Sequence, residues 1–121
     1  MAKLKVLVAE DDLTMVNLLQ TLLKMEGFDV LALEADQDVL KGFNDHCPDV
    51  LLMDVHLAHQ NGLDILDSIR KSADGCGARI VMTSGLNVKD ECMKRGADGF
   101  LLKPFMPDDL IQMLKGDTKL S

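Results

Sequence analysis

Five short apolar segments recur along the chain and constrain its fold more than any other feature. Each is too short for a typical helix and is dominated by large apolar residues, which favours buried strands. The segments occupy residues 4–9, 29–33, 49–54, 78–83 and 99–102. Stretches with helical apolar spacing or helix start and stop signals follow them, at residues 13–25, 36–46, 63–69, 88–95 and 107–115. Because parallel strands need crossover connections, this alternation predicts an α/β fold with five parallel strands and helices on both faces.

The length and the cysteines set the domain count and the expected compartment. A chain of 121 residues suffices for one domain that buries about two-thirds of its extended surface without disulfides, so we interpret residues 1–121 as a single domain. The three cysteines are odd in number and lack a C-x-x-C spacing, which predicts reduced thiols in a cytoplasmic protein. No signal-peptide pattern or bilayer-length apolar run occurs, so we expect no membrane partner.

The net charge of −7 is distributed unevenly along the chain. Residues 1–60 hold 11 acidic and 4 basic side chains, whereas residues 61–121 hold 9 of each. An acidic surface repels phosphate backbones, and the four Phe, without any Trp or Tyr, offer little for stacking on bases. We therefore expect no direct nucleic-acid partner, and expect the acidic half to hold a divalent cation.

Polar side chains follow four of the five predicted strands. They are Asp11 and Asp12, Asp54, Thr83, and Lys103. In an open parallel sheet, ligands bind beyond the carboxyl ends of the strands, so these side chains should converge there. Crowded carboxylates call for a cation, and Mg²⁺ prefers oxygen ligands. A carboxylate beside Mg²⁺ can attack a phosphoryl group whose oxygens are bound by a lysine and a hydroxyl, so the set predicts phosphoryl transfer to Asp54.

Four motifs that contain these residues resemble the receiver domain of the two-component response-regulator family over essentially the full length. The motifs are Val8-Ala9-Glu10-Asp11-Asp12, Leu52-Met53-Asp54, Thr83-Ser84-Gly85 and Gly96-Ala97-Asp98-Gly99-Phe100-Leu101-Leu102-Lys103-Pro104-Phe105. The resemblance implies a flavodoxin-like sheet of strand order 2-1-3-4-5 and a cis Lys103-Pro104 bond. It also implies a stand-alone, chemotaxis-regulator-like module, unless the chain is a piece of a longer protein.

The resemblance implies a phosphoacceptor and a set of metal ligands. Asp54 would accept a phosphoryl group from the phosphohistidine of a sensor histidine kinase or a phosphotransfer protein. Mg²⁺ would be held by Asp11, Asp12, Asp54 and the backbone carbonyl of His56. Beyond its own phosphorylation and dephosphorylation, the domain would not be an enzyme.

Three further residues would complete the switch in such a domain. Thr83 and Lys103 would bind the phosphoryl group, and Thr83 would then turn inward with Phe100 following it. These changes would alter a surface formed by the fourth helix, the fifth strand and the fifth helix, which binds a downstream protein target. The lifetime of the acyl phosphate stays open, because His56 stands where side chains tune it.

The sequence also departs from the family pattern and leaves alternatives open. Leu57-Ala58 replaces the usual Met-Pro, so we expect a less rigid loop over residues 55–62, and the stretch between the predicted fourth and fifth strands is shorter than the pattern. Asp12 could be only the N-cap of the first helix, and Phe100 plain core. Two other functions compete. One is a phosphohydrolase that forms an aspartyl phosphate, which would want a second Asp where His56 stands, and the other is a phosphorylation-independent adaptor.

Overall fold

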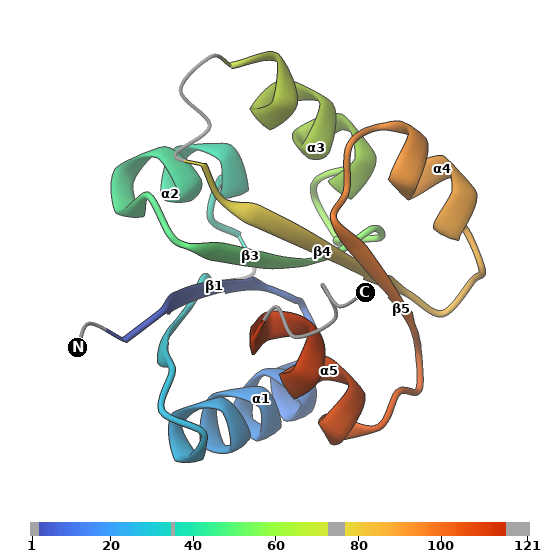
Figure 1. Ribbon diagram of the computed structural model, residues 1–121. Coiled ribbons are helices and arrows are strands. Elements are labelled where there is room, and N and C mark those ends of the chain that lie inside the picture. The colour runs from blue at the N-terminus through green and yellow to red at the C-terminus, as the bar shows by residue number, and fades with distance from the viewer. Residues whose placement is uncertain (1–2, 35, 73–76, 116–121) are drawn as a thin grey trace.

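The computed structural model describes residues 3–34, 36–72 and 77–115, which form a five-stranded parallel sheet in the order β2-β1-β3-β4-β5. The strands are β1 (Lys5–Ala9), β2 (Asp29–Ala32), β3 (Val50–Asp54), β4 (Arg79–Ser84) and β5 (Gly99–Leu102). The helices are α1 (Leu13–Met25), α2 (Val39–His46), α3 (Gly62–Lys71), α4 (Lys89–Lys94) and α5 (Pro107–Lys115). This arrangement, drawn in Figure 1, confirms the predicted fold class and strand order.

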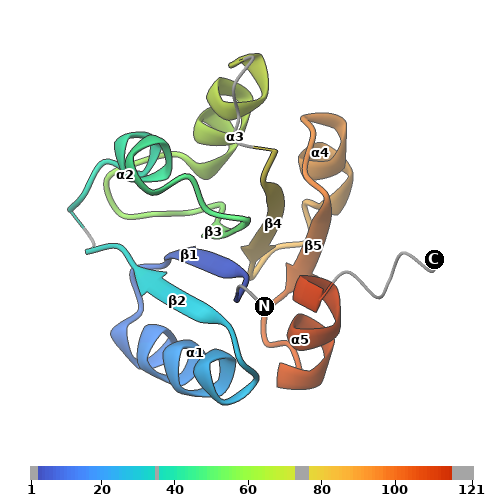
Figure 2. The same cartoon turned by 60° about the vertical axis from the view of Figure 1, so that its left-hand side comes forward.

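Helices cover both faces of the sheet (Figure 2). α1 and α5 pack on one face, where Leu23 and Leu114 have no exposed surface. α2, α3 and α4 pack on the other face, where Phe43 and Leu66 are almost completely buried. Burial of such side chains stabilises each layer by about 1.5–3 kcal/mol per residue. The sheet is therefore enclosed, which explains why its strands are apolar at successive positions.

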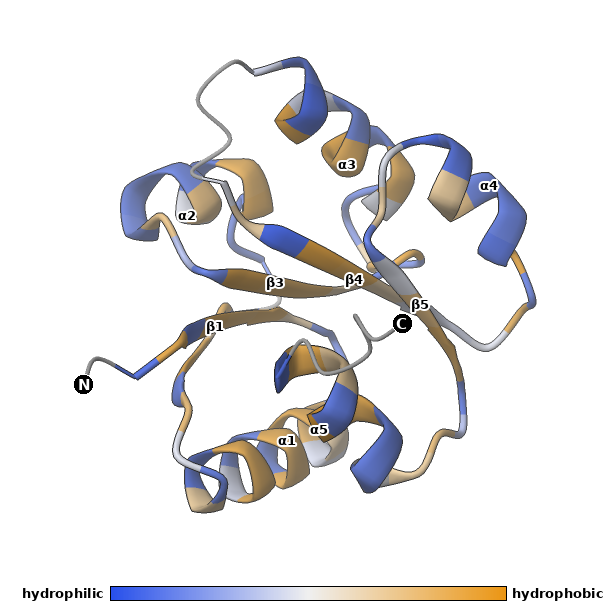
Figure 3. Cartoon of the chain, in the orientation of Figure 1, coloured by the Kyte–Doolittle hydropathy of each residue, from blue (hydrophilic) through white to orange (hydrophobic). Residues whose placement is uncertain are grey.

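The central strand β3 pairs with β1 on one side and β4 on the other. All its residues from Val50 to Asp54 are buried, and Figure 3 shows the central strands as hydrophobic over most of their length. Asp54 is the only charged residue of β3 and lies at its carboxyl end. The sheet thus holds one carboxylate at a fixed, largely desolvated position.

Two helices differ in detail from the sequence prediction. α2 begins at Val39 instead of residue 36, because the Asp38 carboxylate accepts a hydrogen bond from the Lys41 N–H and caps the helix there. α4 has six residues, in keeping with the short segment before β5, and its N-cap residue Val88 makes no side-chain cap bond. No helix within the described ranges is both long and apolar enough to cross a membrane.

Two arginines join α3 to the corner between α4 and β5. Arg70 of α3 donates to the Asp98 carboxylate at 2.7 Å and to the Gly96 carbonyl at 2.8 Å. Arg95, which follows α4, lies 3.1 Å from the Asp67 carboxylate of α3. These contacts hold the carboxyl end of the short α4 against α3.

The cysteines depart from the sequence prediction at one position. Cys47, at the C-cap of α2, is disulfide-bonded, so the prediction of reduced thiols is wrong there. Cys92 is a free, buried thiol whose pKa is raised mainly by burial. Cys76 lies outside the described residues. Sequence spacing missed the disulfide because it does not reveal which parts of a chain approach each other in the fold.

Candidate functional site

Asp54 carries a carboxylate that is only 11% exposed and is bonded through both oxygens. Its Oδ1 accepts from the backbone N–H of His56 at 2.8 Å, and its Oδ2 accepts from Nζ of Lys103 at 2.6 Å. The start of α3 closes on the same residue, since a Cβ at Gly62 would lie 2.5 Å from the Asp54 carbonyl oxygen. The backbone and side chain of Asp54 are therefore held from two sides.

Lys103 follows β5 and brings its ammonium between two buried carboxylates. Nζ lies 2.6 Å from Asp54 Oδ2 and 2.7 Å from Glu10 Oε1. The Lys103-Pro104 peptide bond is cis, as the resemblance implied. Burial alone would lower the pKa of Lys103, but hydrogen bonds and charges from Asp54 and Glu10 outweigh it and raise that pKa. Lys103 therefore stays protonated and available to bind anionic oxygens.

Glu10 is the site residue that sequence analysis missed. The register of β1 on β3 pairs Ala9 with Met53, so the next residues, Glu10 and Asp54, are neighbours at the sheet edge. Its side chain is 8% exposed, and Oε2 accepts from the Asp12 N–H at 3.2 Å. The end of the apolar run at Ala9 was the signal that could have identified Glu10.

Asp12 takes the N-cap role that the sequence had left open as an alternative. Its Oδ1 accepts from the backbone N–H groups of Thr14 at 3.0 Å and Met15 at 3.3 Å, which makes it the N-cap of α1. The side chain is used by the helix because Asp12 stands outside β1 and directly before α1. The structure places Glu10, and not Asp12, against the ammonium that holds Asp54, and the expectation that Asp12 binds a metal stays a prediction.

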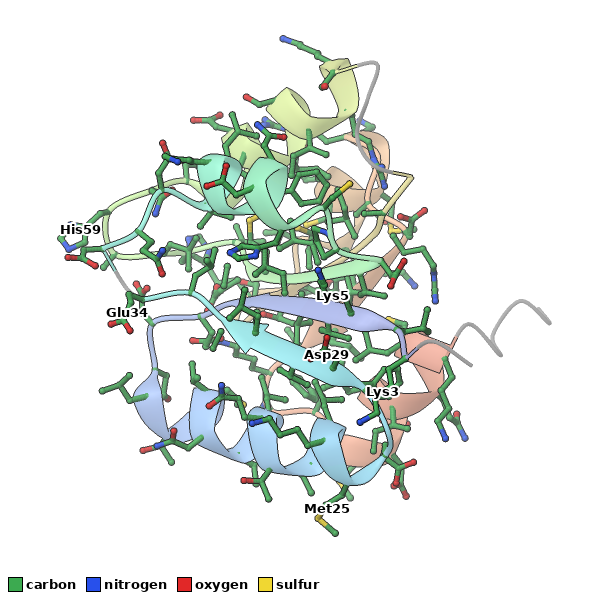
Figure 4. All side chains as sticks on the ribbon, turned by 90° about the vertical axis from the view of Figure 1, so that its left-hand side faces the viewer. Lys3, Lys5, Met25, Asp29, Glu34 and His59 are labelled. Atoms are coloured by element: carbon green, nitrogen blue, oxygen red, sulfur yellow. The ribbon has the colours of Figure 1, made fainter. Side chains whose placement is uncertain are left out.

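Asp11 and the loop after β3 complete the acidic side of the site. The Asp11 carboxylate accepts a hydrogen bond from the backbone N–H of Ala58. His56 forms a β-bridge with Asn61 within this loop. Figure 4 shows His59, from the same loop, on the same side of the molecule as Glu34, which follows β2. The loop therefore covers one flank of the carboxyl edge.

Thr83 and Phe100 come from the neighbouring strands. Thr83 is 3% exposed, pairs in register with Asp54, and lines one hollow with Asp54 and Glu10. Phe100 pairs with Met82 of β4 and is half-buried against the core below α3 and α4. Thr83 is therefore brought to the carboxylates, whereas Phe100 is part of the core packing. Whether Phe100 moves stays a prediction.

The charges at this edge fit a divalent cation. Glu10, Asp11 and Asp54 carry three negative charges against the single positive charge of Lys103, which leaves two uncompensated. Within the described residues, no three or more carboxylate, imidazole or thiol groups are already gathered as a metal cage. Mg²⁺ suits such a site, because it keeps several waters and needs only one or two protein carboxylates.

Comparison with known proteins settles the family. The family model of the response regulator receiver domain matches residues 6–115. The chain belongs to this family. The receiver domain is 32% identical over 115 residues to the transcriptional regulatory protein TrcR of Mycobacterium tuberculosis. The matched region covers 93% of this chain and 44% of TrcR. The receiver domain is 28% identical to the DNA-binding response regulator MtrA of the same species, covering 92% of this chain and 49% of MtrA.

Solved structures agree with this assignment. A putative response regulator from Chloroflexus aurantiacus superposes with a TM-score of 0.86 at 25% identity, covering 95% of this receiver domain and 97% of that chain. The receiver domain of the sensor histidine kinase PA1611 from Pseudomonas aeruginosa, described with a magnesium ion in its active-site cleft, superposes with a TM-score of 0.81 at 24% identity. It covers 94% of this receiver domain and 96% of that chain, and it supports the fold.

The comparisons correct the expectation about nucleic acid. We expected no nucleic-acid partner, but MtrA is named a DNA-binding response regulator and TrcR a transcriptional regulatory protein. The receiver domain spans less than half the length of either relative. The charge argument failed because it concerned only these 121 residues, whereas the relatives extend well beyond the matched region.

Proposed function

We propose that this receiver domain accepts a phosphoryl group on Asp54 from the phosphohistidine of a sensor histidine kinase or phosphotransfer protein. In this reaction an Asp54 oxygen forms the new O–P bond while the P–N bond of the phosphohistidine breaks, and the freed imidazole keeps the electron pair. The observation that carries the proposal is the Lys103 ammonium bound to both Asp54 and Glu10 beside Thr83. An exposed acid in a loop would have no such surroundings.

Glu10, Asp11, Asp54 and the backbone carbonyl of His56 would hold Mg²⁺ in this proposal. When bound, Mg²⁺ would offset the charge of the carboxylates and of the incoming phosphoryl oxygens. Glu10 has a second task, because its bond to Lys103 keeps the ammonium beside the nucleophile. The solved PA1611 receiver domain with magnesium supports the choice of cation by similarity.

Lys103 and Thr83 would bind the phosphoryl group after transfer. Nζ of Lys103 already contacts Oδ2 of Asp54. A small displacement of the ammonium would therefore let Nζ bind an oxygen of a phosphoryl group on Asp54. The added charge of about −1.5 to −2 draws the Thr83 hydroxyl toward it. We propose that the domain's chemistry ends with its own phosphorylation and dephosphorylation, so that it is a switch and not a turnover enzyme.

The switched surface would comprise α4, β5 and α5. Met93 of α4 and Leu102 of β5 are exposed apolar side chains, as are Leu86 and Met106 in the loops that lead into α4 and α5. Such a group at the edge of the sheet suits a protein interface that forms when Thr83 moves. The names of TrcR and MtrA favour DNA binding by a linked or associated unit as the eventual output. A cytoplasmic location is part of the same proposal.

Intact-protein mass measurement tests the proposal directly. Incubation with acetyl phosphate and Mg²⁺ should add one phosphoryl group to the wild type and none to Asp54→Asn. Omission of Mg²⁺ with a chelator should prevent the addition. An equal mass gain in both proteins would exclude Asp54 as the acceptor.

A further inference from the structure

Gln60 lies in the loop between β3 and α3 and joins this loop to α2. Its Oε1 accepts a hydrogen bond from the backbone N–H of Val39 at 2.9 Å, and its Nε2 donates to the backbone carbonyl of Gln37 at 2.7 Å. Figure 2 shows the loop beside the start of this helix. Both ends of the side-chain amide are therefore bound to the backbone where α2 begins.

The start of α2 is a firm anchor for the loop. The Asp38 carboxylate caps the helix, and the Val39 side chain is buried within the core. The Val39 N–H is one of the first donors of the helix, which find no partner within the helix itself. Gln60 supplies that partner from another part of the chain, so the hydrogen bond serves the helix and the loop together.

The loop needs a directional anchor because its sequence contains no proline. Leu57-Ala58 stands where the family pattern has Met-Pro, and a proline would restrict the backbone there. Leu57 packs partly against the core, but apolar contact has no direction. The bridge between His56 and Asn61 closes the loop on itself. The two hydrogen bonds of Gln60 set the orientation of the loop, because each depends on an angle as well as a distance.

The same loop carries one of the proposed ligands of Mg²⁺. The backbone carbonyl of His56 would bind the cation, and the N–H of His56 already donates to Oδ1 of Asp54 at 2.8 Å. Gln60 also lines a hollow with Glu10 and Asp11, so the anchor lies beside the acidic edge of the sheet. A ligand in a loop binds a metal well only when the surrounding residues hold it in the right orientation.

We propose that Gln60 is a positioning residue, which holds the loop between β3 and α3 so that the His56 carbonyl is directed at the cation. This inference rests on the proposed function, because it concerns the same Mg²⁺ site. Loss of an outer group that orients a metal ligand typically weakens metal affinity by about 10–100-fold. If Gln60 only capped α2, its loss would lower the stability of the domain and leave the Mg²⁺ affinity unchanged.

Gln60→Met tests the proposal, because methionine has a similar length but lacks the amide. Calorimetric titration with MgCl₂ should give a dissociation constant about 10-fold higher than in the wild type. Phosphorylation by acetyl phosphate should need a correspondingly higher Mg²⁺ concentration to reach half its maximal rate. The rate at saturating Mg²⁺ should stay close to that of the wild type, because Asp54, Thr83 and Lys103 come from the strand ends and not from this loop.

His59→Ala is the matched control, because His59 is an exposed residue of the same loop, and its Mg²⁺ affinity should equal that of the wild type. Amide hydrogen exchange by NMR checks the contact itself, since the Val39 N–H should exchange at least about 10-fold faster in Gln60→Met. An unchanged Mg²⁺ affinity in Gln60→Met, or an equal loss in His59→Ala, would overturn the positioning role alone. Wild-type protein that neither binds Mg²⁺ nor gains a phosphoryl group would contradict the proposed function instead.

Discussion

Replacement of Lys103 by methionine should destabilise the domain strongly. Methionine fills a similar volume but leaves Glu10 and Asp54, which are 8% and 11% exposed, as buried carboxylates without a counter-charge. Breaking a buried ion pair by removing one partner costs about 3–5 kcal/mol. Lys103 itself is 22% exposed, so we expect about 3 kcal/mol in Lys103→Met at pH 7.

The pH dependence of this loss has a defined sign. Without Lys103, the two carboxyl groups repel each other in the folded protein, and binding of a proton relieves this repulsion. The folded variant then binds more protons than the unfolded chain, so its free energy of unfolding increases as the pH falls from 7 toward 5. In the wild type, the raised pKa of Lys103 gives stability that is complete below pH 10.5 and is lost as the pH rises through the folded-state value.

Urea unfolding followed by circular dichroism at pH 5, 7 and 9, with and without Mg²⁺, measures the loss of stability in Lys103→Met and its recovery at low pH. Mg²⁺ should raise the unfolding free energy of Lys103→Met more than that of the wild type, because it supplies the missing positive charge. Lys41→Met is the matched control, since Lys41 forms an exposed pair with Asp45 and its loss should leave the midpoint unchanged. A loss below about 1 kcal/mol in Lys103→Met, with no recovery at pH 5, would refute the buried-charge argument.

Two other substitutions probe the scaffold of the site. Gly62→Ala places a Cβ against the Asp54 carbonyl oxygen, so it should lower the free energy of unfolding by about 1–3 kcal/mol, measured by thermal unfolding, and slow phosphorylation by acetyl phosphate. Unchanged stability and rate would show that α3 moves freely away from β3. Asp12→Ala removes the N-cap of α1, so it should lower the free energy of unfolding by about 1 kcal/mol, while the Mg²⁺ affinity measured by calorimetry stays at the wild-type value. A large loss of Mg²⁺ affinity would indicate that Asp12 is a metal ligand.

The sheet could be predicted from sequence because its strands are buried on both faces. Residues 50–53 form an uninterrupted apolar run, and stretches with helical apolar spacing lie between such runs. This alternation of strands and helices leaves few possible sheet topologies. The start of α2 was misplaced because a polar stretch precedes it, and the Asp38 cap that fixes the boundary depends on backbone geometry.

The acidic residues of the site could be predicted only as a group. Three acids follow β1 in succession, and which of them meets Asp54 depends on the residue at which the strand ends. Since β1 ends at Ala9, Glu10 directly follows the strand beside Asp54, and Asp12 is the N-cap of α1.

The bridge of Lys103 to Glu10 and Asp54 joins groups separated by 93 and 49 positions of sequence. A chain that has folded only as far as β3 has the Asp54 carboxylate but lacks its ammonium partner. The arrangement on which the proposed phosphoryl transfer depends is therefore complete only when the last strand has docked on the sheet.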